Sequence, residues 1–315
     1  MSTSSNAGAE TEFSIHPKTL IGPVALTVAN LENQIGFYRQ ALGFQLHWQE
    51  DNRAGLGAPF GDLTTGGEDL LRLVEQPNVK RYRRVTGLYH FAVLFPDRRE
   101  LARAIARLLA LKYPNYPTDH IMTKSTYLDD PEGNGIELYT ESPEDGTWFM
   151  ANGTFEARRA NGTPSNGREP LDVDALLSHL TDKDRLDLPV PPETRMGHVH
   201  LHVRNVDEAV GFYHGVLGFD VMGIAERIGM AFVSAGGYHH HIGLNTWQGE
   251  GAPPPPADAA GLRHFTVELP DQQSLDQVVA RVEQAGIPAN QTEDGLLVHD
   301  PSQNGVILAL RHASS

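Results

Sequence analysis

The chain alternates between stretches with the two-residue period of a strand and stretches with the spacing of a helix. Apolar residues alternate with other residues over 24–28 and again over 199–203, which is typical of strands. A helical spacing of apolar residues predicts an amphipathic helix, with Leu101, Ile105, Leu108 and Leu109 on one face. Short strand-like runs follow. The pattern therefore predicts an α+β protein in which strands and helices recur along the chain.

Two segments of the chain occur twice. Residues 30–44 are similar to 205–219, and residues 88–97 are similar to 262–271. Each copy keeps the same order of strand, helix and short strands, so the chain is predicted to contain four βαβββ modules. Their predicted bounds are 22–75, 88–141, 196–247 and 262–311.

The modules divide the chain into regions with different expected roles. Residues 1–20 are expected to form a disordered tail, because the first residues are small and polar without an apolar core. Residues 21–141 and 195–312 each hold two modules. Residues 142–194 are rich in glycine, asparagine, proline and charge, and are expected to be a linker with one short helix over 172–180 and no chemical role.

Composition and charge exclude several classes of partner and ligand. A net charge of −15 argues against nucleic acid, whose phosphates require clustered lysine and arginine. No apolar run approaches the roughly 20 residues of a membrane span, and without an export signal a cytoplasmic location is expected. The chain has no cysteine, so histidine, aspartate and glutamate are the metal ligands available. Whether the protein forms a homo-oligomer is left open.

The stretch from His120 to Glu137 carries the clearest chemical signal. The run 130–135, Asp-Pro-Glu-Gly-Asn-Gly, predicts a tight hairpin turn. If the turn centres on Glu132, Tyr127 and Glu137 lie opposite each other, with Cβ atoms roughly 5 Å apart. A buried carboxylate at this position needs a partner, and a metal ion is one of the few that suffices.

Comparing the modules with one another indicates which copies carry chemical groups. The aligned positions are His90 with His264, Glu137 with Ile307, Tyr127 with Leu297, His120 with Asn290, and His198 with Pro23. The fourth module therefore keeps the turn but lacks the carboxylate, and the first lacks the histidine. Functional groups concentrate in the second and third modules, and His264 is expected to be a relic or a packing residue.

Four βαβββ modules resemble the vicinal oxygen chelate superfamily, in which two modules pair into an open, cupped sheet that holds a metal. The stretch containing His120, Tyr127 and Glu137 resembles the signature of extradiol ring-cleaving dioxygenases. Thr126 departs from that signature, which usually has an aliphatic residue there. Within the superfamily, the chain is most similar to two-barrel catechol 2,3-dioxygenases of bacteria. The resemblance implies two open mixed β-barrels.

The resemblance also implies a metal site, because metal ligands of this superfamily lie on the first and last strands of a module. That rule points to His90, Glu137 and His198, the set of two histidines and one carboxylate found in non-haem Fe(II) oxygenases. Fe(II) is therefore the expected metal, with Mn(II) left open. The site is expected to join the second and third modules, leaving the first and fourth to form a second barrel.

Three further residues are implied by the same resemblance to act on the substrate. Matching the apolar strand at 242–244 points to His240 as the catalytic histidine, with His241 one position away as the alternative. Tyr127 and His120 are expected to hold a substrate oxygen and to donate a proton as the ring opens.

The implied reaction is cleavage of catechol or a related aromatic diol by O2, giving a product of the 2-hydroxymuconic semialdehyde type. The ring substituents of the substrate are not visible in the sequence. One alternative is a glyoxalase-like isomerase or lyase, which usually has a fuller set of protein ligands. Another is a binding protein for aromatic drugs, as in bleomycin resistance, which leaves the histidines and Glu137 without a purpose.

Overall fold

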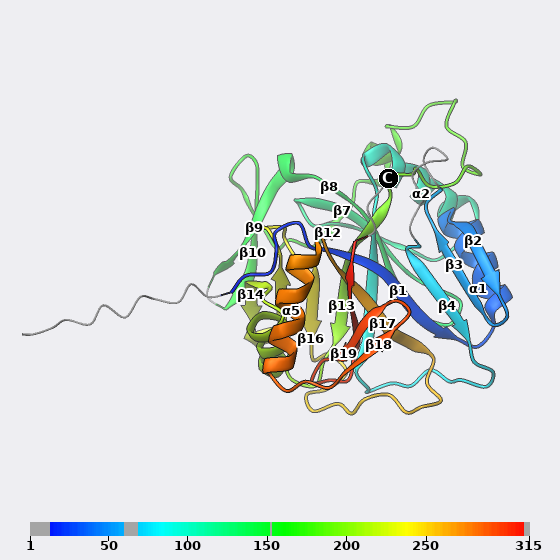
Figure 1. Cartoon of the computed structure of the whole chain (residues 1–315). Helices are drawn as coiled ribbons and strands as arrows, with labels where there is room; N and C mark the ends of the chain where they lie inside the picture. The colour runs from blue at the N-terminus through cyan, green and yellow to red at the C-terminus, as the bar shows by residue number, and fades with distance from the viewer. Residues whose placement is uncertain (1–12, 60–68, 152, 312–315) are drawn as a thin grey trace, which may run out of the picture.

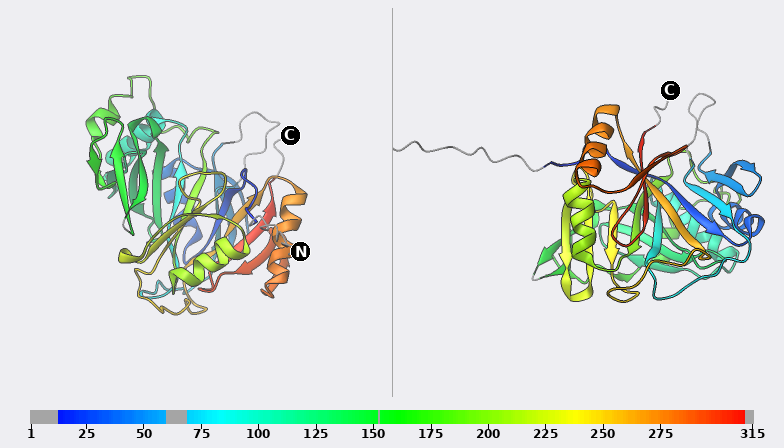
Figure 2. Two further views of the ribbon diagram at one scale, coloured as in Figure 1. Left: turned by 90° about the vertical axis from the view of Figure 1, so that its left-hand side faces the viewer. Right: turned by 60° about the horizontal axis from the view of Figure 1, so that its bottom comes forward.

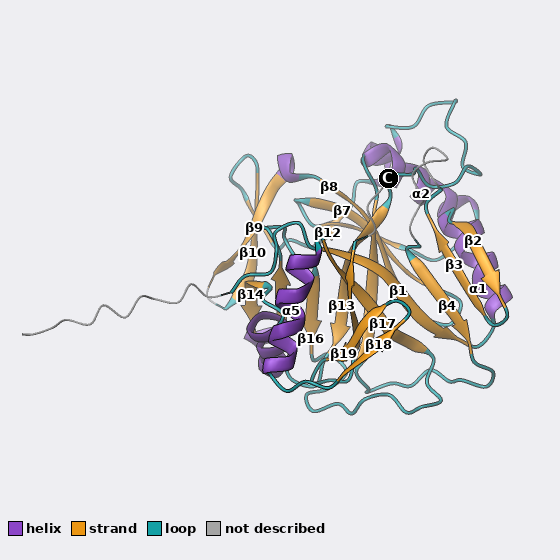
Figure 3. Cartoon of the chain, in the orientation of Figure 1, coloured by secondary structure: helices purple, strands orange, loops and turns teal. Residues whose placement is uncertain are grey.

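Two open β-sheets with helices on two sides make up the computed structural model of the chain (Figures 1 and 3). The structure describes residues 13–59, 69–151 and 153–311. Strands parallel and antiparallel to their neighbours occur in both large sheets. The predicted α+β class and the open, mixed sheets are confirmed.

The first sheet is built from the first and fourth modules and has eight strands. Their order is β18 (Ala289–Thr292), β19 (Gly295–His299), β20 (Gly305–Leu310), β17 (Gly261–Leu269), β1 (Leu20–Val28), β4 (Leu71–Glu75), β3 (Arg53–Gly57) and β2 (Gln45–Glu50). The register of β1 against β17 shifts between Ile21 and Val24, on either side of Pro23. A proline has no N–H for the ladder, so a bulge is where a strand can accommodate it.

The second sheet is built mainly from the second and third modules and has nine strands. Their order is β12 (Glu169–Pro170), β6 (Tyr116–Asp119), β7 (Thr123–Asp129), β8 (Gly135–Glu141), β5 (Gly87–Leu94), β13 (Arg195–His202), β16 (Ile242–Asn245), β15 (Met230–Ser234) and β14 (Asp220–Ala225). The antiparallel pair β5–β13 joins the two modules. The predicted pairing of the second module with the third, and of the first with the fourth, is therefore confirmed.

The initial strands of the four modules meet in the centre of the molecule. Strand β1 packs on β13 and β17 packs on β5, so the two sheets are in contact through these strands (Figure 1). Leu26, Phe91, Val199 and Phe265, one from each strand, are completely buried in one continuous apolar core. Each half of the chain therefore contributes to both sheets and to the core between them.

The helices cover the outer faces of the sheets, α1 and α2 on one side and α4 and α5 on the other (Figure 2, right). They are α1 (Leu31–Phe37), α2 (Arg98–Ala110), α3 (Val173–Leu177), α4 (Val206–Val210) and α5 (Gln272–Gln284), and π-helical turns extend α1 over Tyr38–Leu42 and α4 over Gly211–Val216. The four module helices begin after capping residues Asn30, Asp97, Asn205 and Asp271, whose side chains each accept a backbone N–H. Helix α2 buries Leu101, Ile105 and Leu108, but Leu109 is 49% exposed, so its predicted place on the buried face is wrong.

The turn between β7 and β8 has the predicted geometry. Tyr127 lies directly opposite Glu137. Asp130 holds the turn, because its Oδ1 accepts the N–H groups of Glu132 at 2.9 Å and Asn134 at 2.8 Å. The Tyr38 hydroxyl from α1's extension donates to Asp130 Oδ2 at 2.8 Å. This network ties the first module to the hairpin that carries Glu137.

The fourth module repeats this turn, but only some of the positions that the sequence aligns with the second module coincide in the structure. Leu297 lies opposite Ile307, as Tyr127 lies opposite Glu137. Asn290, however, lies opposite Leu297, which is the place that Tyr116 holds opposite Tyr127. The predicted match of Asn290 with His120 is therefore wrong, because the outer hairpin of the fourth module is shorter.

Two peripheral regions differ from expectation. Residues 142–194 contain, besides α3, a three-stranded sheet of β9 (Gly146–Ala151), β10 (Thr154–Arg159) and β11 (Pro164–Ser165), and β9 and β10 lie against β14 (Figure 1). Trp148 of β9 and Phe155 of β10 pack on Phe232, and these aromatic contacts hold the small sheet against the body of the protein. Of the expected disordered tail, residues 1–12 lie outside the described residues. Residues 13–20 are ordered against the body of the protein, because Ile15 is buried and its N–H donates to the Gly218 carbonyl at 2.7 Å.

Candidate active site

Three neighbouring strands of the nine-stranded sheet bring together the residues expected to bind a metal. His90 is on β5, Glu137 on β8 and His198 on β13, and β5 lies between the other two. Glu137 and His198 both pair with Ala92, one on each side, and His90 lies two residues away on the same face. The methyl group of Ala92 leaves the space between them open. All three side chains therefore point to one place.

The distances within this group are those of converging ligands. Glu137 Oε2 lies 3.1 Å from His198 Nε2 and 3.3 Å from His90 Nε2. One ligand atom from each of the three residues lies within 4.8 Å of the other two, and all three residues are buried. Among the described residues, this is the one group of three or more possible ligands that meets these conditions. Ser125 Oγ donates to the other oxygen, Glu137 Oε1, at 2.6 Å and fixes the carboxylate.

Burial and mutual contacts set the charges of these groups. Burial lowers the pKa of His198 to about 4, although the Glu137 carboxylate acts in the opposite direction. Burial favours a neutral Glu137, but the hydrogen bonds and charges of His198 and His90 outweigh it and hold the pKa of Glu137 well below its usual range. At neutral pH Glu137 is therefore ionised and the ring of His198 is neutral, which are the protonation states that a metal requires of these two residues.

The hydrogen bonding of the histidines also fits a cation at this position. Nδ1 of His90 and Nδ1 of His198 are buried without a hydrogen-bond partner, and His90 Nε2 has only its 3.3 Å contact with Glu137 Oε2, which lacks good hydrogen-bond geometry. An unpaired buried polar group costs about 1–3 kcal/mol, so such groups call for an explanation. A divalent cation between the two Nε2 atoms and Glu137 Oε2 would satisfy His90 Nε2. The donor set of two imidazoles and one carboxylate suits Fe(II).

His240 and His241 occupy different environments. His240 lines the cavity beside the three residues, with its ring centroid 4.2 Å from that of His198, and it stacks on Phe232. Burial lowers the pKa of His240 well below its usual value, so its ring is neutral. His241 is directed away from the cavity, since its Nδ1 bonds to Ser234 Oγ at 2.9 Å and accepts the Ala235 N–H at 3.2 Å. Of the two alternatives, His240 has the position from which it can act on a bound molecule.

The neighbouring His239 orients the ring of His240. His239 Nε2 lies 3.1 Å from the Glu141 carboxylate and donates to it. His239 Nδ1 lies 2.7 Å from His240 Nδ1, so one of the two nitrogens donates to the other and the two rings are fixed relative to each other.

Tyr127 and His120, the other two residues expected to act on substrate, form a hydrogen-bonded pair. Tyr127 Oη lies 2.8 Å from His120 Nε2. Burial and the nearby Glu137 charge raise the pKa of Tyr127 well above its usual value, and burial lowers the pKa of His120. Both side chains are therefore uncharged at neutral pH, and both line the same cavity as the three possible ligands.

The cavity has a volume of about 360 Å³, within the range of sites for small ligands. Its walls include five aromatic side chains besides Tyr127, namely Tyr89, Trp148, Phe155, Phe232 and Trp247. Trp148 and Phe155 come from β9 and β10, so the segment expected to have no chemical role forms part of the wall. The pairing of Trp148 and Phe155 with Phe232 brings it there. The aromatic residues in that segment were the signal that sequence reasoning passed over.

Two more residues belong to the site. His200, on β13 with His198, is buried, lines the cavity and has an Nε2 without a hydrogen-bond partner. Arg168, which was not considered, lies with its guanidinium 5.8 Å from the centre of the Tyr127 ring. Thr126, the departure from the family signature, is buried and donates to Asn115 Oδ1 at 2.8 Å, so the hydroxyl is satisfied.

His264 lies in the other sheet, on β17, and does not contact the three possible ligands. Burial lowers its pKa to about 4, and its Nε2 is 4.0 Å from Asp294. The position equivalent to Glu137 is the buried Ile307.

Comparison with known proteins agrees with this architecture. The model of the glyoxalase/bleomycin resistance protein/dioxygenase superfamily matches residues 20–138 and 195–304. The chain belongs to this superfamily. The chain is also 43% identical over 297 residues to a catechol-2,3-dioxygenase of Bacillus subtilis (strain 168), covering 93% of this chain and 98% of the relative.

Solved structures show the superfamily fold at lower identity. A putative dioxygenase from Bacillus subtilis has a TM-score of 0.61 at 12% identity, covering 95% of this chain and 86% of that one. Glyoxalase I from Zea mays has a TM-score of 0.54 at 14% identity, covering 92% of each chain. These similarities establish the fold alone. No helix in the described parts of this superfamily member is long and apolar enough to cross a membrane.

Proposed function

We propose that this protein is an Fe(II)-dependent extradiol dioxygenase. It would cleave the ring of catechol or a related aromatic diol with O2 and give a product of the 2-hydroxymuconic semialdehyde type. The observation that carries the proposal is the convergence of His90, Glu137 and His198 on one face of an aromatic-lined cavity that also holds His240 and Tyr127. The 43% identity to a relative named catechol-2,3-dioxygenase supports the same reaction class.

His90, Glu137 and His198 would hold the metal beside the cavity. Two neutral imidazoles and one carboxylate leave a divalent cation one net positive charge, which attracts an anionic diol. Fe(II), when bound, supplies the redox chemistry that allows an aromatic diol to react with triplet dioxygen. Mn(II) could serve the same donor set.

The remaining residues would bind the ring and move protons. His240 is neutral, so its ring can take a proton from a diol hydroxyl placed beside His198. Tyr127 and His120 lie on the β7–β8 side of the cavity, where they can hold a substrate oxygen and return a proton as the ring opens. The aromatic walls fit a planar ring and exclude water from it.

The direct test uses the full-length protein, stripped of metal and reloaded with Fe(II) without oxygen. On addition of catechol and O2 we expect a yellow ring-cleaved product and oxygen uptake equal to the catechol consumed. Protein reloaded with Zn(II) is the matched control, because zinc occupies such ligands without redox chemistry. Mn(II)-loaded protein in the same assay identifies which metal supports turnover. Methylcatechols, chlorocatechols and hydroquinones then define the ring substituents.

Fe(II)-loaded protein that binds these diols without oxygen uptake would reject the proposal and favour a binding protein. An isomerase or lyase of the glyoxalase kind is less well supported by the site. Such enzymes usually use a fuller ligand set, and the described residues bring a single carboxylate into the converging group.

A further inference from the structure

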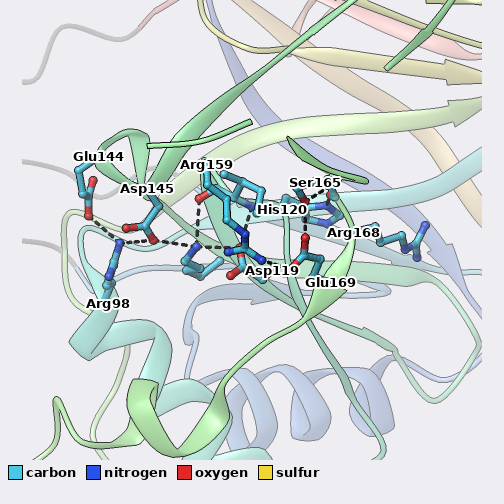
Figure 4. Close-up of polar contacts among 12 residues, drawn as sticks. Arg98, Asp119, His120, Glu144, Asp145, Arg159, Ser165, Arg168 and Glu169 are labelled. Atoms are coloured by element: carbon cyan, nitrogen blue, oxygen red, sulfur yellow. Dashed lines mark hydrogen bonds and ion pairs between the residues drawn. The ribbon is translucent and has the colours of Figure 1, made fainter. Parts of the chain in front are cut away.

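A turn in the segment after the second module contacts one of the proposed proton-transfer residues. The Gly167 carbonyl lies 2.7 Å from His120 Nδ1 (Figure 4 labels His120). A carbonyl oxygen can only accept, so Nδ1 must carry a proton. In the neutral ring, Nε2 then has a lone pair and accepts the hydroxyl proton of Tyr127, 2.8 Å away. One backbone carbonyl therefore sets the direction of the His120–Tyr127 hydrogen bond.

Side chains of the same segment hold that carbonyl in place. Ser165 Oγ accepts the Gly167 N–H at 3.0 Å and donates to the Glu169 carboxylate, which also receives Arg159 (Figure 4). Gly167 has a φ of +69°, a left-handed conformation that glycine adopts without strain. The contacts form a chain from Arg159 through Glu169 and Ser165 to the turn.

The sheet provides a second anchor for the turn. Strand β12 pairs with β6, and Glu169 lies directly opposite Asp119, the residue before His120. The turn that carries Gly167 and the loop that carries His120 are thus both attached to the strand pair β6–β12. Burial lowers the pKa of His120, so the contact involves a neutral ring whose two tautomers differ in which nitrogen can accept a proton.

We propose that the turn 165–169 selects the Nδ1–H tautomer of His120, and that Ser165 and Glu169 are positioning residues for proton transfer by Tyr127 and His120. The catalytic part of this inference rests on the proposed ring cleavage. In the opposite tautomer, Nε2–H would donate to the Tyr127 oxygen, and His120 could no longer accept the proton of the phenol. The direction of the His120–Tyr127 hydrogen bond would then be reversed.

The tautomer can be measured without turnover, by ¹⁵N NMR of histidine-labelled, full-length, metal-free protein. The His120 resonance is assigned by its loss in His120→Gln. We expect protonated Nδ1 and unprotonated Nε2 in the wild type. Ser165→Ala and Glu169→Gln should increase the share of the Nε2–H tautomer, whereas Ser165→Thr, which keeps the hydroxyl, should behave as wild type.

Thr163→Val is the matched control, because it removes a hydroxyl that bonds only to Asn161 in the adjoining hairpin. It should leave the His120 tautomer unchanged. An Nε2–H tautomer in the wild type would overturn the inference, as would an unchanged tautomer in both Ser165→Ala and Glu169→Gln.

The kinetic arm uses the same variants loaded with Fe(II). Ser165→Ala should lower kcat about 10-fold with KM unchanged, the scale expected when a partner that orients a histidine is lost. Ser165→Thr and Thr163→Val should retain the wild-type kcat. A shifted tautomer with wild-type kcat would reject the positioning role. A wild-type protein that does not cleave catechol rejects the proposed function instead, and the NMR result then decides the tautomer selection alone.

Discussion

Histidine side chains in this protein differ in what their ring nitrogens contact, and those contacts separate their roles. His198 and His90 direct Nε2 at one carboxylate oxygen, His120 bonds to a backbone carbonyl, and His241 is bonded to Ser234. All four are at least partly buried, so their hydrogen-bond partners, and not their exposure, distinguish a possible ligand from a packing residue.

Removing any one of the possible ligands should abolish tight metal binding. His90→Ala, His198→Ala and Glu137→Gln each leave two protein donors, so the affinity should fall by more than the roughly 10–100-fold typical of losing an outer-shell partner. Metal content after gel filtration measures the effect, and circular dichroism checks the fold. His264→Ala is the matched control and should keep its metal, since it lies in the other sheet. Full metal content in any of the three variants would remove that residue from the site.

The two neighbouring histidines should respond in opposite ways to substitution. His240→Phe should retain metal but lower turnover by roughly 10²–10⁴-fold, as for a positioned acid–base group. His241→Phe leaves Ser234 Oγ and the Ala235 N–H without their partner and should instead cost about 1–3 kcal/mol in the free energy of unfolding. Steady-state kinetics and urea unfolding separate the two effects. The reverse pattern would assign the catalytic role to His241.

At the scale of elements, close strand pairing decides whether the ligands meet. Gly135 is paired with His90, and a Cβ on Gly135 would collide with the Tyr89 carbonyl. Gly305 is its counterpart in the fourth module, where a Cβ would collide with the Arg263 carbonyl. The same close approach of backbones therefore occurs in both sheets, but only one of them carries the possible ligands.

The two glycines make a matched pair of substitutions. Gly135→Ala and Gly305→Ala should each destabilise the protein by about 1–3 kcal/mol, because the backbone must move to admit a methyl group. Gly135→Ala should also weaken metal binding, since it displaces β8 from β5 and so Glu137 from His90. Urea unfolding and metal titration test this. Equal metal affinity in the two variants would show that the strand spacing does not limit the site.

At the scale of the whole molecule, each sheet combines one module from each half of the chain. Antiparallel pairing of β5 with β13 and of β1 with β17 makes each half dependent on the other. A half alone would expose these strand edges, and it would hold either Glu137 with His90 or His198 with His240, but not both pairs.

Cutting the chain after Asp182, an exposed position, tests this dependence while leaving the turn 165–169 with the second module. Each half alone should bind Fe(II) weakly and show no ring cleavage. The co-expressed halves should reassociate and recover metal binding and part of the activity. Co-expression with Glu137→Gln in the first half should recover neither. An isolated half that binds metal tightly and cleaves catechol would contradict the shared site.

Local pattern and the internal repeat predicted much of this protein from the sequence. Periodicity and the Asp130 turn act over a few residues, so the strands and helices of the modules and the Tyr127–Glu137 pairing could be predicted directly. The pairing of the second module with the third could also be predicted, because Ile307 and Pro23, the aligned residues in the fourth and first modules, lack ligand atoms. The choice of His240 over His241, the ordering of Ile15 and the aromatic wall from β9 and β10 required the tertiary structure. So did the contact of Gly167 with His120, since a backbone carbonyl has no sequence signal and only packing determines what it faces.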